Sequence, residues 1–308
     1  MKGLVTKSTG SWCMVRGEEG INYECRMKGK FRNDGIKSTN PVAVGDKVEF
    51  QMEKDGKGII DSIEPRNNYI IRKATNLSKQ THIIAVNMDQ AILVVSLVFP
   101  ETLTGFIDRF LVTAEAYSIP PLILFNKIDL YNPAILEKLR DLERVYTSIG
   151  YPCISVSAEK EINLEAIKNV LKGKISLLAG NSGVGKTTLI NKLEPGFDLK
   201  TGIVSQAHHM GIHTTTFAEM FELNFGGFVI DTPGLKSFGI VDFQKEELFH
   251  YFPEMFGIVG DCKFGNCTHI NEPGCAVKKA LEKGEIAPHR YENYLNIYNG
   301  DEMEVKYE

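Results

Sequence analysis

Alternating apolar and polar residues fill short stretches of the first 68 positions, and turn residues such as Gly10, Gly45 and Asn33-Asp34-Gly35 separate these stretches. Alternation of this kind predicts β-strands with one buried face. The expected strands span 4–6, 12–16, 21–27, 47–52 and 58–63. Five short strands in one small region predict an antiparallel barrel, for which the five-stranded OB-fold is the leading candidate.

From residue 69 the pattern changes. The segment 69–80 is polar and basic and is expected to be a linker. Apolar runs of strand length then alternate with longer segments of helical period. The expected strands are 90–97, 121–125, 153–156 and 175–179, with a hairpin of 217–223 and 228–230, and the expected helices are 103–117, 133–149, 164–171 and 188–193. This alternation indicates a mostly parallel sheet covered by helices on both faces.

The composition of the 308 residues, 43% hydrophobic and 24% charged, is typical of a soluble globular protein with room for two or three domains. No run approaches the ~20 apolar residues that a membrane span needs. Residues 1–7 lack the apolar region of a signal peptide. We therefore expect a cytoplasmic protein that does not associate with membranes. We also expect a monomer.

The net charge of −4 argues against a globally basic nucleic-acid binder. Residues 1–70 hold 12 basic and 10 acidic side chains, whereas residues 241–308 hold 7 and 13, so any contact with nucleic acid must be local. The third expected strand and the loop after it carry a basic and aromatic group, namely Arg26, Lys28, Lys30, Phe31, Arg32 and Lys37. This group fits a single-stranded nucleic-acid surface on a barrel and also fits a solvated loop.

A glycine-rich segment between strand 175–179 and helix 188–193 matches the phosphate-binding pattern G-x-x-x-x-G-K-[ST]. Its backbone N–H groups would surround phosphate oxygens, and Lys186 would reach the β- and γ-phosphates. The hydroxyl of Thr187 would ligate Mg²⁺. The expected nucleotide-binding residues here are Gly180, Asn181, Ser182, Gly183, Val184, Gly185, Lys186, Thr187 and Thr188.

Asn126, Lys127 and Asp129 follow strand 121–125 at its carboxyl end, where ligands of doubly wound sheets bind. The Asp129 carboxylate can accept hydrogen bonds from the guanine N1–H and N2 amine, donors that adenine lacks, which disfavours an ATPase. The Asn126 amide can bond the base edge, and the Lys127 stem can lie over the ring. Ser157-Ala158, after the next strand, would turn a backbone N–H toward the guanine carbonyl. GTP and GDP are therefore the expected ligands.

The segment from Asp231 to Gly234 fits the second phosphate-side element, with Asp231 directed toward Mg²⁺, directly or through water. The Gly234 N–H would contact the γ-phosphate. Between the two phosphate elements, a polar stretch ends in three threonines. We expect Thr215 to be the mobile Mg²⁺ ligand, with Thr214 as the alternative.

Leu235 stands where Ras-type enzymes carry the glutamine that orients the attacking water, and leucine cannot form that hydrogen bond. We expect His213, beside the threonines, to position the water, with simple packing as the alternative. His213, Lys186 and Thr215 are the expected catalytic residues.

Four residues near the end of the chain, Cys262, Cys267, His269 and Cys275, supply three thiolates and one imidazole within 14 positions. This set can close a tetrahedral zinc site without an open position, which implies one structural Zn²⁺. Because the spacing is not the common C-x₂-C, free thiols are the alternative. Helices are expected at 276–283 and 291–298. The other cysteines, Cys13, Cys25 and Cys153, are expected to be buried apolar residues.

The GTPase elements occur in a permuted order, since the base-binding motif precedes the phosphate-binding loop. This order, with a barrel ahead and a cysteine cluster behind, resembles the bacterial ribosome small-subunit-dependent GTPase family known as RsgA, YjeQ or YloQ. The resemblance implies an OB-fold domain at 1–68, a circularly permuted α/β GTPase domain at 69–238 and a mainly helical zinc-binding domain at 239–308.

The same resemblance implies an activity and partners. It implies GTP hydrolysis, with Mg²⁺ bound alongside GTP, stimulated by the small (30S) ribosomal subunit. It also implies binding to 16S rRNA and a role in late maturation of that subunit. The alternative is a non-catalytic RNA-binding scaffold that uses GTP only for structural order. The complete set of Lys186, Thr187, Asp231, Asn126 and Asp129 disfavours it.

Overall fold

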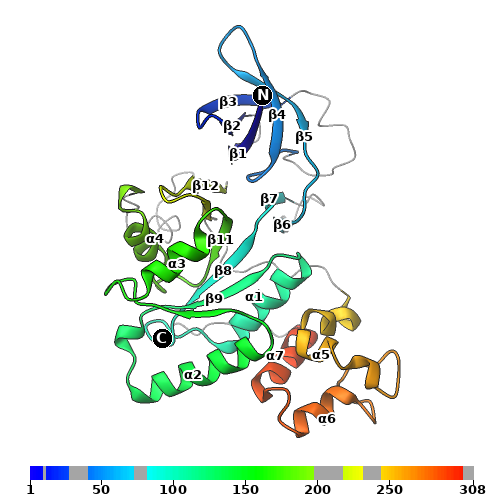
Figure 1. Cartoon of the computed structure of the whole chain (residues 1–308). Coiled ribbons are helices and arrows are strands. Elements are labelled where there is room, and N and C mark those ends of the chain that lie inside the picture. Colours follow the sequence, from blue (N-terminus) through cyan, green and yellow to red (C-terminus); the bar gives the residue numbers. More distant parts are fainter. Residues whose placement is uncertain (10–11, 28–40, 73–81, 198–217, 232–243, 301–308) are drawn as a thin grey trace, which may run out of the picture.

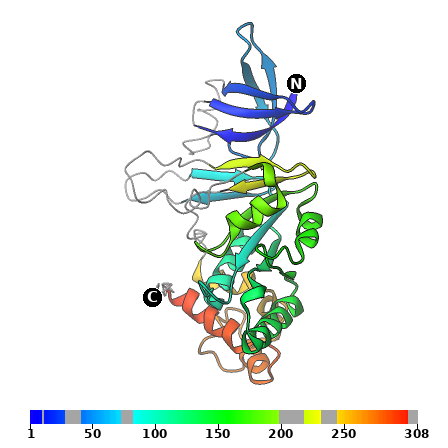
Figure 2. The ribbon, with the colours of Figure 1, turned by 90° about the vertical axis from the view of Figure 1, so that its left-hand side faces the viewer.

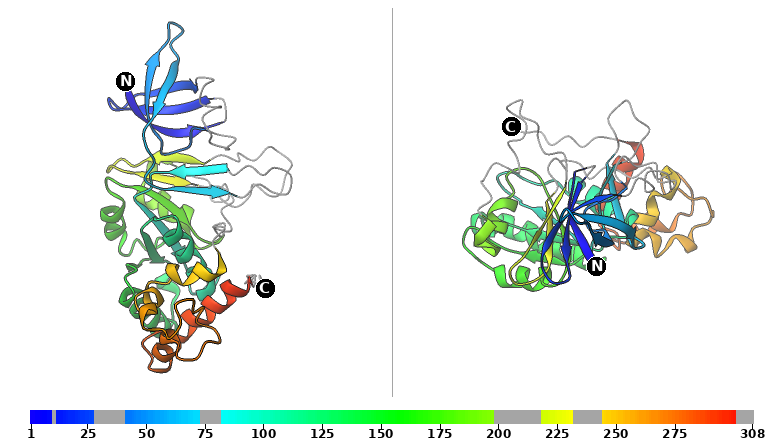
Figure 3. Two further views of the ribbon diagram at one scale, coloured as in Figure 1. Left: turned by 90° about the vertical axis from the view of Figure 1, so that its right-hand side faces the viewer. Right: turned by 90° about the horizontal axis from the view of Figure 1, so that it is seen from above.

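A computed structural model describes residues 1–9, 12–27, 41–72, 82–197, 218–231 and 244–300 of the chain. Three parts follow one another along the molecule: a β-barrel, a sheet covered by helices, and a helical tail (Figures 1 and 2). The sheet lies between the other two. Seen from the barrel end, the tail lies to one side of the sheet (Figure 3, right).

The barrel is closed by five strands: β1 (Lys2–Ser8), β2 (Trp12–Gly17), β3 (Asn22–Met27), β4 (Lys47–Met52) and β5 (Gly58–Ile63). Their neighbour order is β1-β2-β3-β5-β4, and β4 pairs back to β1. β3 and β5 run parallel, while the other neighbours are antiparallel. Alternate side chains, including Val15, Phe50 and Ile60, fill the interior. This pairing confirms the expected OB-like barrel, although the β3–β5 pair is parallel, whereas the sequence predicts antiparallel strands.

A hairpin connects the barrel to the sheet. It consists of β6 (Tyr69–Arg72) and β7 (His82–Val86), which pair antiparallel. The expectation of a linker from 69 to 80 is therefore wrong for its first four residues. Ile70 is fully buried and pairs with Ala85, so tertiary contacts outweigh the basic composition that suggested a linker.

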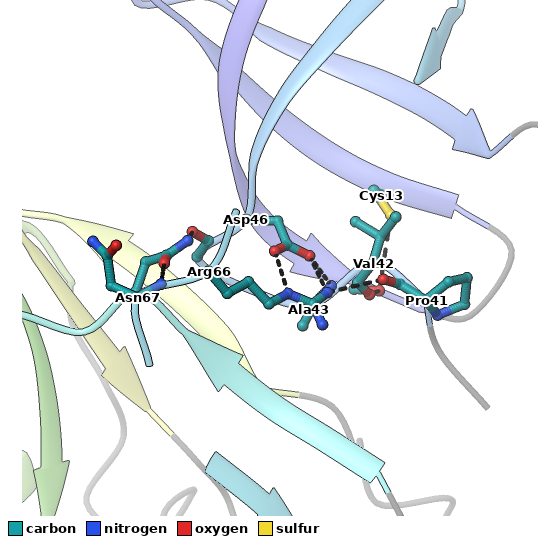
Figure 4. A network of polar contacts seen from close by, with 10 residues as sticks. Cys13, Pro41, Val42, Ala43, Asp46, Arg66 and Asn67 are labelled. Carbon is teal, nitrogen blue, oxygen red and sulfur yellow. Dashed lines mark hydrogen bonds and ion pairs between the residues drawn. The ribbon is translucent and has the colours of Figure 1, made fainter. Parts of the chain in front are cut away.

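The junction between barrel and hairpin is fixed by buried polar contacts (Figure 4). The Asp46 carboxylate is completely buried and accepts hydrogen bonds from Arg66 Nε and Nη2, each at 2.7 Å, and from the Ala43 N–H. Asn87, which follows β7, donates from Nδ2 to the Gly45 carbonyl at 3.0 Å. These contacts hold the barrel against the beginning of the second part.

The central sheet contains β8 (Gln90–Val95), β9 (Pro121–Phe125), β10 (Cys153–Ser155), β11 (Ile175–Ala179), β12 (Glu219–Glu222) and β13 (Phe228–Asp231). The order is β10-β9-β8-β11-β13-β12, and the strands are parallel except β12, which is antiparallel to β13. Beyond β12 the sheet continues into the barrel, because Lys7 of β1 pairs with Glu219. The expected parallel sheet and hairpin are confirmed.

Four helices cover the two faces of this sheet: α1 (Thr104–Ala116), α2 (Pro133–Ser148), α3 (Leu164–Leu171) and α4 (Lys186–Leu193). Successive residues of a strand point to opposite faces of the sheet, so they belong to two separate hydrophobic cores, one on each face. Leu93, Val95 and Phe125 pack against α1 and α2. Ile92, Val94 and Leu124 pack against α3 and α4.

The tail is built from short helices: η4 (Lys245–Tyr251), α5 (Pro253–Phe256), η5 (Val259–Asp261), α6 (Ala276–Glu282) and α7 (Pro288–Asn299). The sequence predicts α6 and most of α7 but not η4 or α5. The tail has a core of its own, which includes Phe252, Met255 and Tyr294, and it extends to Val112 of α1. Within the described ranges, no helix is long and apolar enough to cross a membrane.

Candidate functional site

Three chain segments meet at one edge of the sheet. β8, β9, β11 and β13 are parallel, so their carboxyl ends lie together. β11 leads into the glycine-rich loop that begins at Gly180, β9 leads into Asn126, and β13 ends at Asp231. The fold therefore brings phosphate-binding and base-binding motifs to the same edge despite their permuted order.

The glycine-rich loop needs glycine at two points of close approach. Gly180 has φ +140°, and a Cβ there would lie 2.2 Å from the Val94 carbonyl oxygen. Gly185 has φ +97°, and a Cβ there would lie 2.4 Å from Asn126 Nδ2. Any other residue would push the loop away from β8 or from the base-binding motif.

Lys186 begins α4 and curves back over the loop. Its ammonium group donates to the carbonyl oxygens of Gly180 at 2.6 Å and Asn181 at 2.7 Å. Thr187 and Thr188 are half-buried in the first turn of α4. The structure thus places these sequence-predicted residues around one loop at a helix N-terminus, the arrangement that binds phosphate groups.

Asn126 connects the three loops of the site. Its side chain is 1% exposed, and its Nδ2 donates to the Val184 carbonyl at 2.9 Å. Its Oδ1 accepts from the Ala158 N–H at 3.0 Å. Both groups, expected to face a base, are hydrogen-bonded within the protein. The Asn126 amide therefore assembles the site by joining the phosphate-binding loop to the Ser157-Ala158 loop.

A cavity of about 220 Å³ lies beside these contacts. It is lined by Asn126, Lys127, Asp129, Leu130, Ala158, Glu159, Gly185 and Thr188. Asp129 is exposed there, so its carboxylate is available to a ligand. The Lys127 ammonium donates to the Phe99 carbonyl, and burial lowers the pKa of Lys127 despite the nearby Asp129 carboxylate. The cavity thus extends from the Asp129 carboxylate, which suits guanine, to Gly185 and Thr188 at the beginning of α4.

Several sequence-predicted residues lie outside the described residues. They are His213, Thr214, Thr215, Gly234 and Leu235 near the phosphates, and Lys28, Lys30, Phe31, Arg32 and Lys37 of the barrel. The backbone of Asp231 ends β13 and pairs with Glu219. On the barrel, Arg26 is exposed and forms an ion pair with Glu53.

The tail brings its four candidate metal ligands together. The three Sγ atoms of Cys262, Cys267 and Cys275 and one ring nitrogen of His269 all lie within 4.8 Å of one another. His269 Nδ1 lies 3.4 Å from Cys275 Sγ and 3.7 Å from Cys262 Sγ. Such separations suit donors around one ion with bonds of about 2.0–2.3 Å, as in zinc sites.

The surroundings of these ligands also suit a cation. Burial raises the pKa of the Cys267 thiol to about 12, so a bound cation is needed to favour the thiolate. Burial lowers the pKa of His269, which keeps the imidazole neutral and able to ligate. The three other cysteines contrast with this cluster: Cys13 and Cys25 are buried in the barrel, and Cys153 is half-buried in β10.

Three residues that support the ligand loop carry no motif, and the sequence alone predicts packing for the two tyrosines but no contact with this loop. Tyr291 and Tyr294 of α7 donate from their hydroxyls to the carbonyls of His269, at 2.7 Å, and Thr268, at 2.6 Å. The Glu272 carboxylate accepts from both the N–H and the hydroxyl of Thr268. Burial opposes ionisation of Glu272, but these and neighbouring hydrogen bonds lower its pKa to about 2. The i, i+3 spacing of the tyrosines was the available signal that they share a face.

Comparison with protein families and sequences gives consistent matches over the chain. The family model described as RsgA GTPase matches residues 63–241, and the RsgA N-terminal domain model matches residues 2–60. The chain is 54% identical over 307 residues to small ribosomal subunit biogenesis GTPase RsgA 2 of Bacteroides thetaiotaomicron, covering 100% of this chain and 99% of that protein. It is 56% identical over 305 residues to small ribosomal subunit biogenesis GTPase RsgA of Christiangramia forsetii, covering 98% and 97%.

Solved structures show the same architecture. YjeQ from Thermotoga maritima superposes with a TM-score of 0.81 at 38% identity, covering 99% of both chains. YloQ, described as a circularly permuted GTPase, superposes with a TM-score of 0.75 at 31% identity, covering 99% of this chain and 96% of its own. Both superpositions cover nearly the whole chain, so the overall fold is shared with both structures.

Proposed function

This chain belongs to the RsgA GTPase family, and we propose from that premise that it hydrolyses GTP to GDP and phosphate during biogenesis of the small ribosomal subunit. The observation that carries the proposal is the position of Asn126. Its amide joins the loop from Gly180 to Lys186 to the Ser157-Ala158 loop, so elements distant in sequence form one nucleotide site.

We propose which residues contact each part of the nucleotide from the hydrogen-bonding groups that they carry. The backbone N–H groups of the loop and the Lys186 ammonium bind the β- and γ-phosphates, with Lys186 exchanging its two carbonyl partners for phosphate oxygens. The Asp129 carboxylate selects guanine. Thr187, Thr215 and Asp231 would hold Mg²⁺, which would neutralise charge on the phosphates.

We propose that His213 positions the attacking water, because Leu235 lacks the amide that does so in Ras-type enzymes. An imidazole can accept a proton or a hydrogen bond near neutral pH. The small subunit then accelerates hydrolysis by ordering the chain between the two phosphate-side elements.

The partners follow from the relatives and the layout of the molecule. Two relatives of over 50% identity are named for small-subunit biogenesis, so we propose the 30S subunit and its 16S rRNA as the partner. We propose domains at 1–68, 69–238 and 239–308, which place the GTPase between two modules able to contact the subunit. We further propose that Cys262, Cys267, His269 and Cys275 bind one structural Zn²⁺.

The decisive experiment measures phosphate release from GTP and from ATP, with and without purified 30S subunits. We expect hydrolysis of GTP rather than ATP, with a marked increase on adding subunits, and little activity in Lys186→Ala. Tight GTP binding by the parent protein without turnover, even with subunits present, would instead favour the non-catalytic scaffold.

A further inference from the structure

Tyr131, just after the base-binding motif, forms two buried hydrogen bonds that the proposed function does not explain. Tyr131 follows the short helix η2 (Ile128–Leu130) and is 8% exposed, packed in the core under α1 and α2. Its hydroxyl accepts a hydrogen bond from the Leu97 N–H at 2.9 Å and donates one to the Asn126 carbonyl at 2.7 Å. Burial raises the pKa of Tyr131, so the hydroxyl keeps the proton that it donates.

These two hydrogen bonds lie just beyond the carboxyl ends of β8 and β9, where the two strands stop pairing. The last ladder pair of β8 and β9 is Val95 with Phe125, and the Asn126 N–H donates to the Val95 carbonyl at 2.8 Å. In a parallel ladder the Asn126 carbonyl would next accept the Leu97 N–H directly. The Tyr131 hydroxyl stands between these two groups and bonds both. It therefore separates the ends of the two strands while leaving neither backbone group unpaired.

The segment after β8 also holds the next residue of the motif, because the Phe99 carbonyl accepts from the Lys127 ammonium. Consecutive residues of the base-binding motif, Asn126 and Lys127, are thus held from the same segment. The backbone of Asn126 is fixed by Tyr131, while its side chain holds the other two loops of the site.

We propose that Tyr131 is a positioning residue for guanine recognition: its hydroxyl spaces the ends of β8 and β9 and fixes the backbone of Asn126, and thereby the geometry of the motif that includes Asp129. This inference rests on the proposed GTPase function and adds a residue to its site. Tyr131 acts through Asn126 and does not touch the nucleotide.

The test is Tyr131→Phe, which keeps the ring and removes the hydroxyl, leaving the Leu97 N–H and the Asn126 carbonyl buried without it. We expect GTP and GDP to bind about tenfold more weakly, the size of effect of one lost buried hydrogen bond. Discrimination against inosine triphosphate, which lacks the 2-amino group bound by Asp129, should fall severalfold. At saturating GTP, kcat should stay within about twofold, since Tyr131 is not expected to contact the γ-phosphate.

Tyr146→Phe is the matched control. Tyr146 is fully buried in the same core, and its hydroxyl donates to Asp108 at 2.8 Å, away from the residues that line the nucleotide cavity. We expect this variant to lose stability but to keep the parent Kd values and the parent preference for GTP over inosine triphosphate. A role in stability alone for Tyr131 would give the two variants the same nucleotide binding, and that result would overturn the proposal.

If Tyr131→Phe does not fold, a fluorotyrosine at position 131 keeps the hydroxyl and alters its strength as a donor. The Kd for GTP should then shift by about twofold or more, while the same replacement at Tyr146 leaves it unchanged; equal Kd values would overturn the proposal. Failure of the proposed function is distinguishable, because the parent protein itself would then not bind or hydrolyse GTP.

Discussion

The Asp108 Oδ1 atom of α1 lies 2.8 Å from the Arg290 Nη1 atom of α7, although the two residues are 182 positions apart in the sequence. Both side chains are buried, at 0% and 1% exposure. Arg290 also pairs with Glu254, and Asp108 accepts from Tyr146 and Asn293. Burial alone would lower the pKa of Arg290, but the two carboxylates raise it. The tail is thus attached to α1, one of the helices that cover the central sheet, through a buried charge network.

Arg290→Met should destabilise the chain by about 3 kcal/mol or more, because two buried carboxylates lose their counter-charge. Urea unfolding measures the change. Arg144→Met, which breaks an exposed pair with Asp141, is the control and should change little. Equal unfolding midpoints for the two variants would contradict this account.

Asp129→Asn should change the nucleotide preference of the protein from GTP to xanthosine triphosphate. The asparagine amide would donate where the carboxylate accepts, which complements the 2-keto group of xanthine instead of the guanine amine. Weaker binding of GTP and stronger binding of xanthosine triphosphate, both measured by titration, are expected. An equal loss of both nucleotides would show that Asp129 does not contact the base.

Removal of metal should affect the tail first. Chelation is expected to release about one Zn²⁺ per chain and to loosen residues beyond about 240, because zinc binding supplies folding free energy to such modules. Metal analysis and hydrogen exchange measure the two effects. Cys267→Ser should lose the metal, whereas Cys153→Ser, a cysteine of β10 outside the cluster, should retain it. Protein prepared with zinc in reducing buffer and found metal-free would contradict the assignment.

His213→Ala should leave GTP affinity within a few-fold and lower subunit-stimulated turnover by about 10²-fold, the scale of a lost general base or water-orienting group. His250→Ala, in η4 of the tail, is a matched histidine control and should hydrolyse GTP at the parent rate. Parent turnover in His213→Ala, with normal binding of GTP and of the subunit, would exclude the catalytic role.

Local patterns predict much of this fold. β4, β5, β9, β11 and α3 begin and end where the sequence pattern places them. β4 alternates between buried and exposed residues, whereas β9 and β11 are short apolar runs that are buried almost throughout. The phosphate-binding loop, Asp129 and the metal ligands are recognisable because fixed chemistry demands fixed residue types at short spacing.

Contacts between distant segments leave no such local signal. Arg290 sits among polar residues of a helix and would be expected on the surface, yet it is almost fully buried against Asp108. The Tyr131 hydroxyl accepts a hydrogen bond from the N–H of Leu97, 34 positions away. The motif places Asn126 in the site, but its bonds to Val184 and Ala158 appear only once the strands are arranged side by side.

The pairing of β1 with β12 also bears on how copies of this chain behave toward one another. β12 is the outermost strand of the central sheet, and an open strand edge offers N–H and C=O groups to any other chain. β1 pairs with the first residue of β12, Glu219, and the Lys7–Glu219 and Arg16–Glu222 ion pairs hold the barrel beside this strand. The opposite edge strand, β10, spans only three residues. The barrel therefore protects β12 from pairing with another chain. A shortened protein that begins at residue 69 and lacks the barrel is expected to aggregate through the exposed edge of β12.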